Sequence, residues 1–220
     1  MKVLFFFLFF SMMNACGMSD KNSMKNGMQQ NVIDLVKENN VEGVKIALER
    51  GADVNTRDKS KRSLLLIATV NKQVEMAKLL VSFNADVNQQ DDHLDSPFLY
   101  AGASGQTELV KLFLKNGARF DIFNRYNGTA LIPACERGHV ETVAVLANTK
   151  AFPINHVNRL GWTALMEAVI LGDGSQKYQE IVTILKNRGA DLTIPDKDGI
   201  TPLQHAKSLG FKEIVKILES

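Results

Sequence analysis

Residues able to bind a metal or to carry out nucleophilic catalysis are few in this chain and lie far apart. A metal site needs several histidine, cysteine or carboxylate side chains at close spacing. The four histidines show no close pair and no carboxylate at ligand spacing. They are His93, His139, His156 and His205. We therefore expect no metal and no other cofactor.

Other catalytic patterns are also missing from the sequence. Residues 196–199 match part of a calcium-binding loop but lack its downstream acid. No serine or cysteine stands in a nucleophile elbow or beside a suitable base, and no glycine-rich phosphate loop is present. Cys135 lies in a small-residue pair of a predicted helix, so burial as an apolar side chain is expected. The sequence predicts that the protein is not an enzyme.

Composition narrows the class of protein further. The 220 residues include 26 Lys and Arg against 24 Asp and Glu, which gives a formal net charge of +2. Phosphate contacts require a much stronger basic field, so nucleic acid is not an expected partner. Apolar residues make up 45% of the chain, enough for a folded core rather than a disordered polar segment.

Three sequence landmarks recur in one register. Gly51-Ala-Asp-Val-Asn55 has counterparts at 84, 117, 151 and 189, at intervals of 33, 33, 34 and 38 residues. A Ser or Thr at 63, 96, 129, 163 and 201 is followed five residues later by Ala. An apolar run (74–80, 108–114, 141–146, 180–185 and 213–218) precedes the next counterpart or the end of the chain. The chain is therefore built from repeated units.

Each unit predicts two helices. The Ser or Thr is a suitable N-cap, and Pro97 and Pro202 stand just inside the first helix, where the missing N–H costs nothing. The second helix has apolar residues at i, i+3 and i+4, so one face packs inward. Left-handed glycines are expected to end the first helices at 105, 138, 172 and 210 and the second at 51, 117 and 189. One pair cannot bury its apolar face alone, so the units must stack.

From residue 31 to residue 220 this pattern resembles the ankyrin repeat, in its 33-residue period, its Thr-Pro-Leu-His-x-Ala start and its Gly-Ala-Asp-Val-Asn turn. The resemblance implies an all-α solenoid of about six helix-pair units joined by β-hairpin loops, the first unit having lost its hairpin. It also implies a structural role for His139. Polar residues suit the exposed ends of the stack: Lys37, Glu38, Lys212 and Glu219.

Two departures from the ankyrin pattern stand out. The family histidine that ties neighbouring hairpins is absent, and its position holds Leu66, Leu99, Ile132, Met166 and Gln204. Apolar packing could then hold the loops, or the four apolar side chains could form a stripe offered to a partner. The fifth unit also carries about five extra residues near 172–177, whose composition predicts a loop between its helices.

Residues 1–15 have the plan of a secretory signal peptide. Lys2 supplies a positive charge, residues 3–10 are apolar without interruption, and Ala15 precedes Cys16. The apolar run is shorter than the roughly twenty residues that a membrane-spanning helix needs. The segment before Cys16 resembles the lipobox of bacterial lipoproteins, which implies cleavage after Ala15 and lipid on Cys16. The alternative is a plain signal peptide cut elsewhere.

Lipid on Cys16 would attach the protein to a membrane through several acyl chains. Residues 16–30 are polar and rich in Asn, Ser, Gly and Lys, which is typical of a flexible tether. Gly17, in place of an Asp after the Cys, favours the outer membrane over the inner one. We expect an exported protein anchored in a bacterial envelope and facing the periplasm, or a secreted protein if the lipobox is not used.

Ankyrin proteins usually contact partners through hairpin tips and the exposed face of the first helices, so the resemblance implies a monomeric, non-catalytic scaffold that binds another protein. The tip candidates are Arg57, Lys59, Arg62, His93, Arg125, Tyr126, Arg159 and Trp162. The first helices add Tyr100, Glu136 and Arg137. Aromatic and arginine side chains dominate interface energies, and the cationic balance of the tips favours an acidic partner. Trp162 could instead simply cover its hairpin.

Two other roles remain open at this point. The protein could be an immunity or effector protein that blocks a specific toxin or host factor. It could also be an accessory protein that supports an oxidative-stress enzyme such as catalase, since some exported bacterial ankyrin proteins do so.

Overall fold

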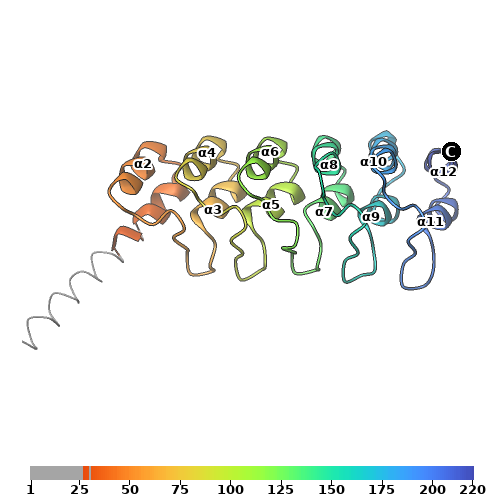
Figure 1. The fold of residues 1–220 in the computed structure, drawn as a ribbon, viewed down its shortest axis with the longest axis horizontal. Helices are drawn as coiled ribbons and strands as arrows, with labels where there is room; N and C mark the ends of the chain where they lie inside the picture. Colours follow the sequence, from red (N-terminus) through yellow and green to blue (C-terminus); the bar gives the residue numbers. More distant parts are fainter. Residues whose placement is uncertain (1–26, 30) are drawn as a thin grey trace, which may run out of the picture.

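The computed structural model describes residues 27–29 and 31–220 as an elongated array of helix pairs (Figure 1). A helix over residues 31–37 precedes the labelled helices. These are α2 (Val41–Glu49), α3 (Leu64–Val70), α4 (Val74–Ser82), α5 (Pro97–Ala103), α6 (Thr107–Lys115), α7 (Leu131–Glu136), α8 (Val140–Ala147), α9 (Ala164–Ile170), α10 (Gln176–Asn187), α11 (Pro202–Ser208) and α12 (Lys212–Glu219). The predicted all-α repeat solenoid is confirmed.

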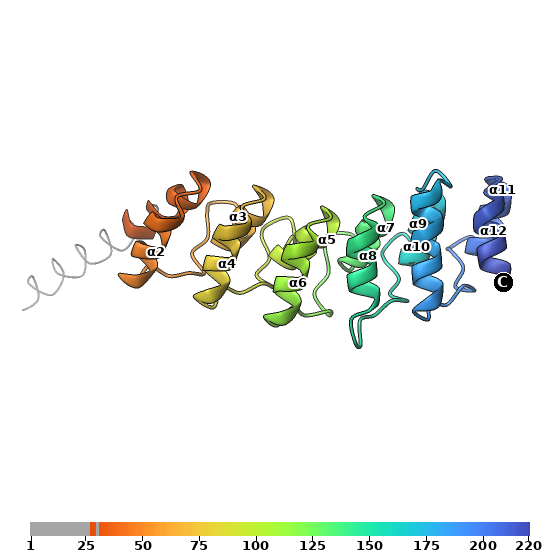
Figure 2. The same ribbon diagram turned by 90° about the horizontal axis from the view of Figure 1, so that it is seen from above.

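The helices form two layers. In Figure 1 the second helices of the units (α2, α4, α6, α8, α10 and α12) lie along the top, and the first helices lie beneath them. The loops that lead into α3, α5, α7, α9 and α11 all project below the first-helix layer. Seen from above, the pairs follow one another along the long axis in chain order (Figure 2). One edge of the molecule is therefore a row of loops.

Four of the five predicted N-caps are confirmed. The side chains of Ser63, Ser96, Thr163 and Thr201 accept the backbone N–H three residues on, at 3.1, 3.2, 3.2 and 3.3 Å. Gln204 completes a capping box by accepting the Thr201 N–H at 2.8 Å. Each such cap stabilises its helix by about 0.5–2 kcal/mol, which fixes where the preceding loop ends.

The fifth predicted N-cap, Thr129, is wrong. Helix α7 begins at Leu131 with Ala130 as its N-cap, and the Thr129 hydroxyl is buried with no hydrogen-bond partner. In the other four units, the N–H four residues after the cap donates to the cap carbonyl at 2.9–3.0 Å. The corresponding residue here is Pro133, which has no N–H. The first helical bond is therefore missing, and the helix starts one residue later.

Left-handed glycines end the helices as predicted, with one exception. Gly105, Gly138 and Gly210 have φ of 69°, 73° and 73°. Gly51, Gly117 and Gly189 have φ of 93°, 85° and 86°. The prediction for Gly172 is wrong, because the left-handed residue in that unit is Gly174, with φ of 72°. Gly172 is needed for space instead, since a Cβ there would lie 2.3 Å from the Ala168 carbonyl oxygen.

The extra residues of the fifth unit are only partly loop. Residues 172–175 form a turn, but α10 already begins at Gln176 and has 12 residues, whereas α4 has 9 and α8 has 8. The insertion therefore lengthens a helix as well as a connection. The predicted loop over 172–177 is wrong for its last two residues.

A single apolar core runs the length of the array, from Val32 to Leu218. At the position of the missing family histidine, Leu66, Leu99, Ile132 and Met166 are no more than 4% exposed. The interpretation that they form a stripe offered to a partner is therefore wrong, and the four side chains are buried in the interior. Cys135 is buried as predicted. The polar residues predicted at the two ends, Lys37, Glu38, Lys212 and Glu219, are exposed.

The connecting loops differ from the predicted β-hairpins in detail. Within residues 27–29 and 31–220 no strand forms, and the only bridge is an isolated antiparallel one between Arg57 and Ser63. Each loop is closed by turns and side-chain hydrogen bonds instead of a ladder of backbone pairs.

The predicted signal peptide (1–15) and the lipidation site Cys16 lie outside the described residues. Of the predicted tether (16–30), the structure describes residues 27–29, which are helical. In the part of the chain that is described, no helix has the length and apolar character needed to cross a membrane.

Candidate functional site

The five projecting loops end in tips of the same geometry, each opened by an Asp or Asn. These residues are Asp58, Asp91, Asn124, Asn158 and Asp196, and they lie 33, 33, 34 and 38 residues apart. In every tip the side-chain Oδ1 accepts the backbone N–H groups two and four residues on, at 2.8–3.1 Å. The N–H of the Asp or Asn donates to the carbonyl four residues on, at 2.9–3.0 Å.

The fourth residue of each tip has a left-handed backbone. At the five tips this residue is Lys61, Leu94, Asn127, Gly161 or Gly199, with φ between 57° and 90°. One acidic or amide side chain thus holds a five-residue turn, as in other Asx-type turns. Sequence reasoning missed this scaffold, although an Asp or Asn at the repeat interval was visible in the chain.

We use the term tip row for residues 58–62, 91–95, 124–128, 157–162 and 196–200. Neighbouring tips are joined by hydrogen bonds and ion pairs. Lys61 Nζ lies 2.6 Å from Asp92 Oδ1, the Arg159 N–H donates to the Tyr126 carbonyl at 2.9 Å, and Lys197 Nζ donates to the Arg159 carbonyl at 2.5 Å. Apolar packing alone therefore does not hold the loops, and polar contacts between tips take over the role of the missing family histidine.

Further ties lie just behind the tips. Arg57, beside the first tip, donates to the carbonyls of Lys61 and Gln90. Gln90 Nε2 donates to the Phe123 carbonyl at 2.8 Å, and the Phe123 ring stacks on His156 with 4.3 Å between centroids. Every tip is thus connected to the next, so the row presents its side chains from a fixed backbone.

The predicted tip residues fall into three groups: side chains that are only exposed, two arginines with structural roles, of which Arg57 is also exposed, and the half-buried Trp162. Lys59, His93, Arg125, Tyr126 and Arg159 are exposed. Arg57 and Arg62 have structural roles: the Arg57 guanidinium binds loop carbonyls, and Arg62 pairs with Asp58 at 2.7 Å. Burial of Asp58 raises its pKa, but hydrogen bonds from Arg62 outweigh this effect, and the net pKa is lowered. Trp162 is half-buried.

Exposed apolar side chains lie on four of the five tips, interspersed with charged ones. There are five of them: Leu94, Tyr126, Val157, Leu160 and Ile200, which are 37–52% exposed. The Arg125 guanidinium lies 5.0 Å from the centre of the Tyr126 ring and 3.8 Å from Asp95. Sequence reasoning missed Leu94, Val157, Leu160 and Ile200, because only an alignment of the tips shows that they share an edge.

The first-helix candidates lie next to one another on α5 and α7. Tyr100 and Glu136 are half-buried, and Arg137 is exposed and donates to the Ala103 carbonyl at 2.7 Å. This group is set apart from the tips, and its exposed area is small.

Glu167 on α9 was not predicted as a site residue. It is 4% exposed, and Asn158 Nδ2 donates to its Oε1 at 2.8 Å. Burial, and next the charge of Glu136, raise the pKa of Glu167 to about 7. Its burial depends on how α9 packs against α7, so the sequence pattern could not identify it.

The surroundings of His139 and Cys135 indicate structural roles for both side chains. The His139 ring packs against Gly105, where a Cβ would lie 2.6 Å from Nδ1, and burial lowers the pKa of His139. Burial raises the pKa of the Cys135 thiol well above its usual value. Among the described residues, no group of three or more His, Cys, Asp or Glu side chains could hold a metal.

A hollow of about 160 Å³ lies in the N-terminal part of the array. It is lined by Met28, Asn31, Gly43, Ile46, Ala47 and Arg50. It is smaller than the 300–1,000 Å³ typical of small-molecule sites. The tip row is therefore the better candidate for a functional surface.

Comparison with known proteins decides the family. The model for ankyrin repeats (3 copies) matches residues 32–124 and 98–196. The chain belongs to the ankyrin repeat family. It is 33% identical over 182 residues to the ankyrin repeat protein YahD of Escherichia coli (strain K12), covering 83% of this chain and 90% of that protein. Ankyrin repeat proteins are generally scaffolds that bind other proteins, and the family is typically non-enzymatic.

Solved ankyrin structures agree with this assignment. The chain is similar to an ankyrin repeat domain from Acinetobacter baumannii AYE, with 45% identity, a TM-score of 0.83 and coverage of 86% of this chain and 95% of that one. It is also similar to the ankyrin repeat protein EF0377, with 39% identity and a TM-score of 0.84. The match covers 86% of this chain and 96% of that one.

Proposed function

We propose that this ankyrin repeat protein is a non-catalytic scaffold, exported and lipid-anchored in a bacterial envelope, that binds another protein through the tip row. One observation supports the contact surface above all. Five tips with the same hydrogen-bonded turn place exposed aromatic, aliphatic and cationic side chains along one edge of the array. Large apolar side chains with arginine beside them are the types that contribute most to protein interfaces.

The partner that fits this surface carries apolar side chains flanked by acidic ones. Tyr126 and Leu160 are the most exposed apolar residues of the row, at 52% and 48%. Arg125 and Arg159, which adjoin them in sequence, are exposed cations, and Lys59 is a further exposed cation on the first tip. The turns are held before any partner arrives, so binding orders few backbone groups and loses little free energy to conformational entropy. In this proposal the protein acts as a monomer.

Replacement of the tip side chains tests the contact surface. We expect Tyr126→Ser with Leu160→Ser to reduce capture of the partner, crosslinked in the native envelope and identified by mass spectrometry, by at least tenfold. The physical reason is the loss of about 2 kcal/mol or more where interface residues are truncated. Folding should be unchanged, because both side chains are exposed and the turn itself is held by Asn124 and Asn158.

A matched control uses the opposite layer. Ile46→Ser with Lys111→Ala changes exposed residues of α2 and α6 and should leave the crosslinked product unchanged. Loss of the product in this control, with the tip variant intact, would assign binding to the second helices. A toxin, a host factor or an oxidative-stress enzyme among the crosslinked proteins would identify the role of the complex.

The anchor is tested separately at Cys16. The lipobox-like segment supports lipidation, so an inhibitor of lipoprotein signal peptidase should cause the precursor to accumulate. Cys16→Ala should likewise leave the precursor unprocessed and without the acyl chains that give lasting attachment. Processing that ignores both the inhibitor and the substitution would show that a plain signal peptide is used.

A further inference from the structure

Asn158 links the fifth unit's tip to the helix behind it. Its Oδ1 accepts the N–H groups of Leu160 and Trp162 at 2.9 and 3.1 Å, which holds the turn. Its Nδ2 donates to Glu167 Oε1 on α9 at 2.8 Å. Asn158 is 6% exposed, so both sets of hydrogen bonds are shielded from water. A single buried amide therefore connects Leu160 and Trp162 to a carboxyl group.

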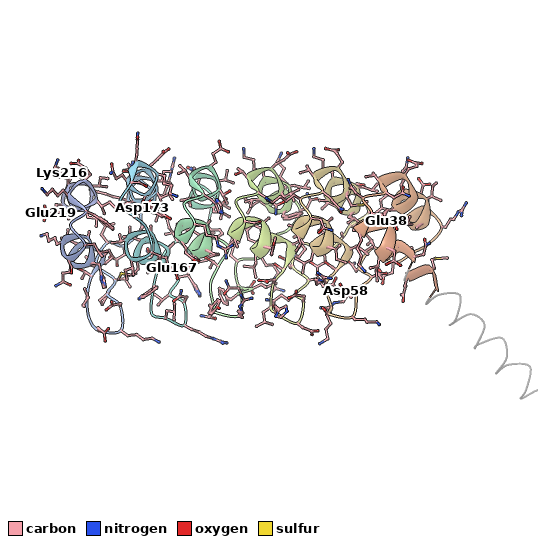
Figure 3. The ribbon with its side chains drawn as sticks, turned by 180° about the vertical axis from the view of Figure 1, so that it is seen from behind. Glu38, Asp58, Glu167, Asp173, Lys216 and Glu219 are labelled. Atoms are coloured by element: carbon pink, nitrogen blue, oxygen red, sulfur yellow. The ribbon has the colours of Figure 1, made fainter. Side chains whose placement is uncertain are left out.

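The group that holds the tip from behind differs between units. The position of Glu167 is occupied by Ile67, Tyr100 and Pro133 in the second, third and fourth units. In the sixth unit His205 is there, and its Nε2 lies 2.7 Å from Asp196 Oδ2. Figure 3 labels Glu167 between the α9 ribbon and the loop that carries the tip. Among the five tips, only the one opened by Asn158 is tied to a carboxyl group on the first helix of its unit.

The surroundings of Glu167 disfavour its charge. On α7, Cys135 is fully buried and Glu136 adds a negative charge. On α10, the Tyr178 hydroxyl donates to the Glu136 carbonyl at 2.8 Å rather than to a carboxylate. On α11, His205 is paired with Asp196. Within residues 31–220, no ion pair of the structure includes Glu167.

We propose that Glu167 is a positioning residue of the tip row, whose carboxyl holds the tip opened by Asn158 in place when neutral and loosens it when ionised. The neutral carboxyl stays buried and accepts the Asn158 hydrogen bond. The carboxylate, next to Glu136 and without a cation, gains hydration by moving toward water. This gain opposes the hydrogen bond from Asn158, which favours the ionised form, and burial outweighs that bond. Once Asn158 Nδ2 is released, Asn158 Oδ1 still holds the turn at Leu160 and Trp162, but the turn loses its tie to α9. The functional meaning of this inference rests on the proposed binding role of the row.

The raised pKa of Glu167, about 7, places this change near neutral pH, since burial and a neighbouring like charge both favour the neutral form of a carboxyl. The contact surface would accordingly be better ordered in a mildly acidic compartment than in an alkaline one. If a bound partner excludes water from α7 and α9, the Glu167 carboxylate would take up a proton when the complex forms.

Trp162 provides a direct test, because it is the only tryptophan of the chain. The fluorescence emission spectrum of Trp162 is to be recorded on the full mature protein between pH 5 and pH 9. We expect the emission maximum to shift to longer wavelength as pH rises, with a midpoint near pH 7, because the half-buried indole becomes more exposed. In Glu167→Gln, which keeps an acceptor for Asn158 but does not ionise, the emission should stay flat and match that of the wild-type protein at low pH.

Histidines titrate in the same range and supply the controls. His156→Asn and His205→Asn should keep the Trp162 transition, because neither changes the link between Asn158 and Glu167. Far-UV circular dichroism should stay constant throughout, which separates a local movement from unfolding.

Three results would overturn the inference: a flat wild-type emission, an unchanged transition in Glu167→Gln, or a transition abolished by a histidine variant alone. The measurement needs no partner, so its failure leaves the proposed binding role standing. Conversely, a clear Trp162 transition, together with unchanged partner capture in the variant with Tyr126→Ser and Leu160→Ser, would reject only the proposed function.

Discussion

Phe113→Ala is expected to lower the free energy of unfolding by about 3–5 kcal/mol, the usual cost of removing a buried phenylalanine. Phe113 is 0% exposed on α6, in the middle of the array. Because α6 packs against both α4 and α8, the cavity weakens the unit's contacts with both neighbours. Stability in a repeat array depends on such contacts between adjacent units. The measurement is equilibrium unfolding in urea.

The matched control for this variant is Lys111→Ala on the same helix. Lys111 is exposed, so its loss should change stability by no more than about 0.5 kcal/mol. If Phe113→Ala cost no more than this control, α6 would not be stacked between two units, and the solenoid described above would be wrong.

Glu167→Gln is expected to stabilise the protein at alkaline pH, which is unusual for a change at a buried residue. The pKa of Glu167 is raised from 4.5 to about 7 in the fold, so folding opposes its ionisation. Stability is therefore greatest below the unfolded pKa, falls as pH rises from about 4.5 through 7, and stays low above that. At 1.36 kcal/mol per pKa unit, the loss approaches about 3 kcal/mol.

Glutamine does not ionise and so avoids this loss. Its amide buries a donor without a partner, which costs about 1 kcal/mol at any pH. We therefore expect a net increase of about 2 kcal/mol at pH 8.5 and a net decrease of up to about 1 kcal/mol at pH 4.5. Urea unfolding at the two pH values measures the difference. Glu141→Gln, at an exposed position of α8, should show no such dependence on pH. Equal stability of Glu167→Gln and wild type at pH 8.5 would contradict the pKa assigned here.

Much of the fold could be predicted from the sequence, because the same capping residues and glycines recur at the same positions in several units. Serine or threonine caps and left-handed glycines were placed correctly wherever the local sequence followed the common pattern. The errors arose where one residue differed. Pro133 removed the first helical bond behind Thr129, an effect that is local in the sequence, and the left-handed residue of the fifth unit is Gly174. The need for glycine at 172 comes from its close approach to Ala168 and Tyr178, which only the structure shows.

The site could be predicted only in outline. The cationic and aromatic residues of the tips were found, because they stand at loop positions of the repeat. The structural roles of Arg57 and Arg62, and the buried link from Asn158 to Glu167, depend on distances between segments that the sequence does not contain. The exposed apolar residues of the row were missed because each looks ordinary within its own unit.

The Asx turn leaves one position of each tip free of structural duty. The third residue takes part through its backbone alone: its N–H donates within the turn, and at Ser60 and Tyr126 its carbonyl also accepts an N–H from the next tip. The residues at this position are Ser60, His93, Tyr126, Leu160 and Asp198. Five unlike side chains on one backbone geometry show that this position accepts almost any residue without harm to the fold. Natural selection can therefore retarget the molecule by single substitutions there, and a protein engineer could use the same five positions to build a library of binders.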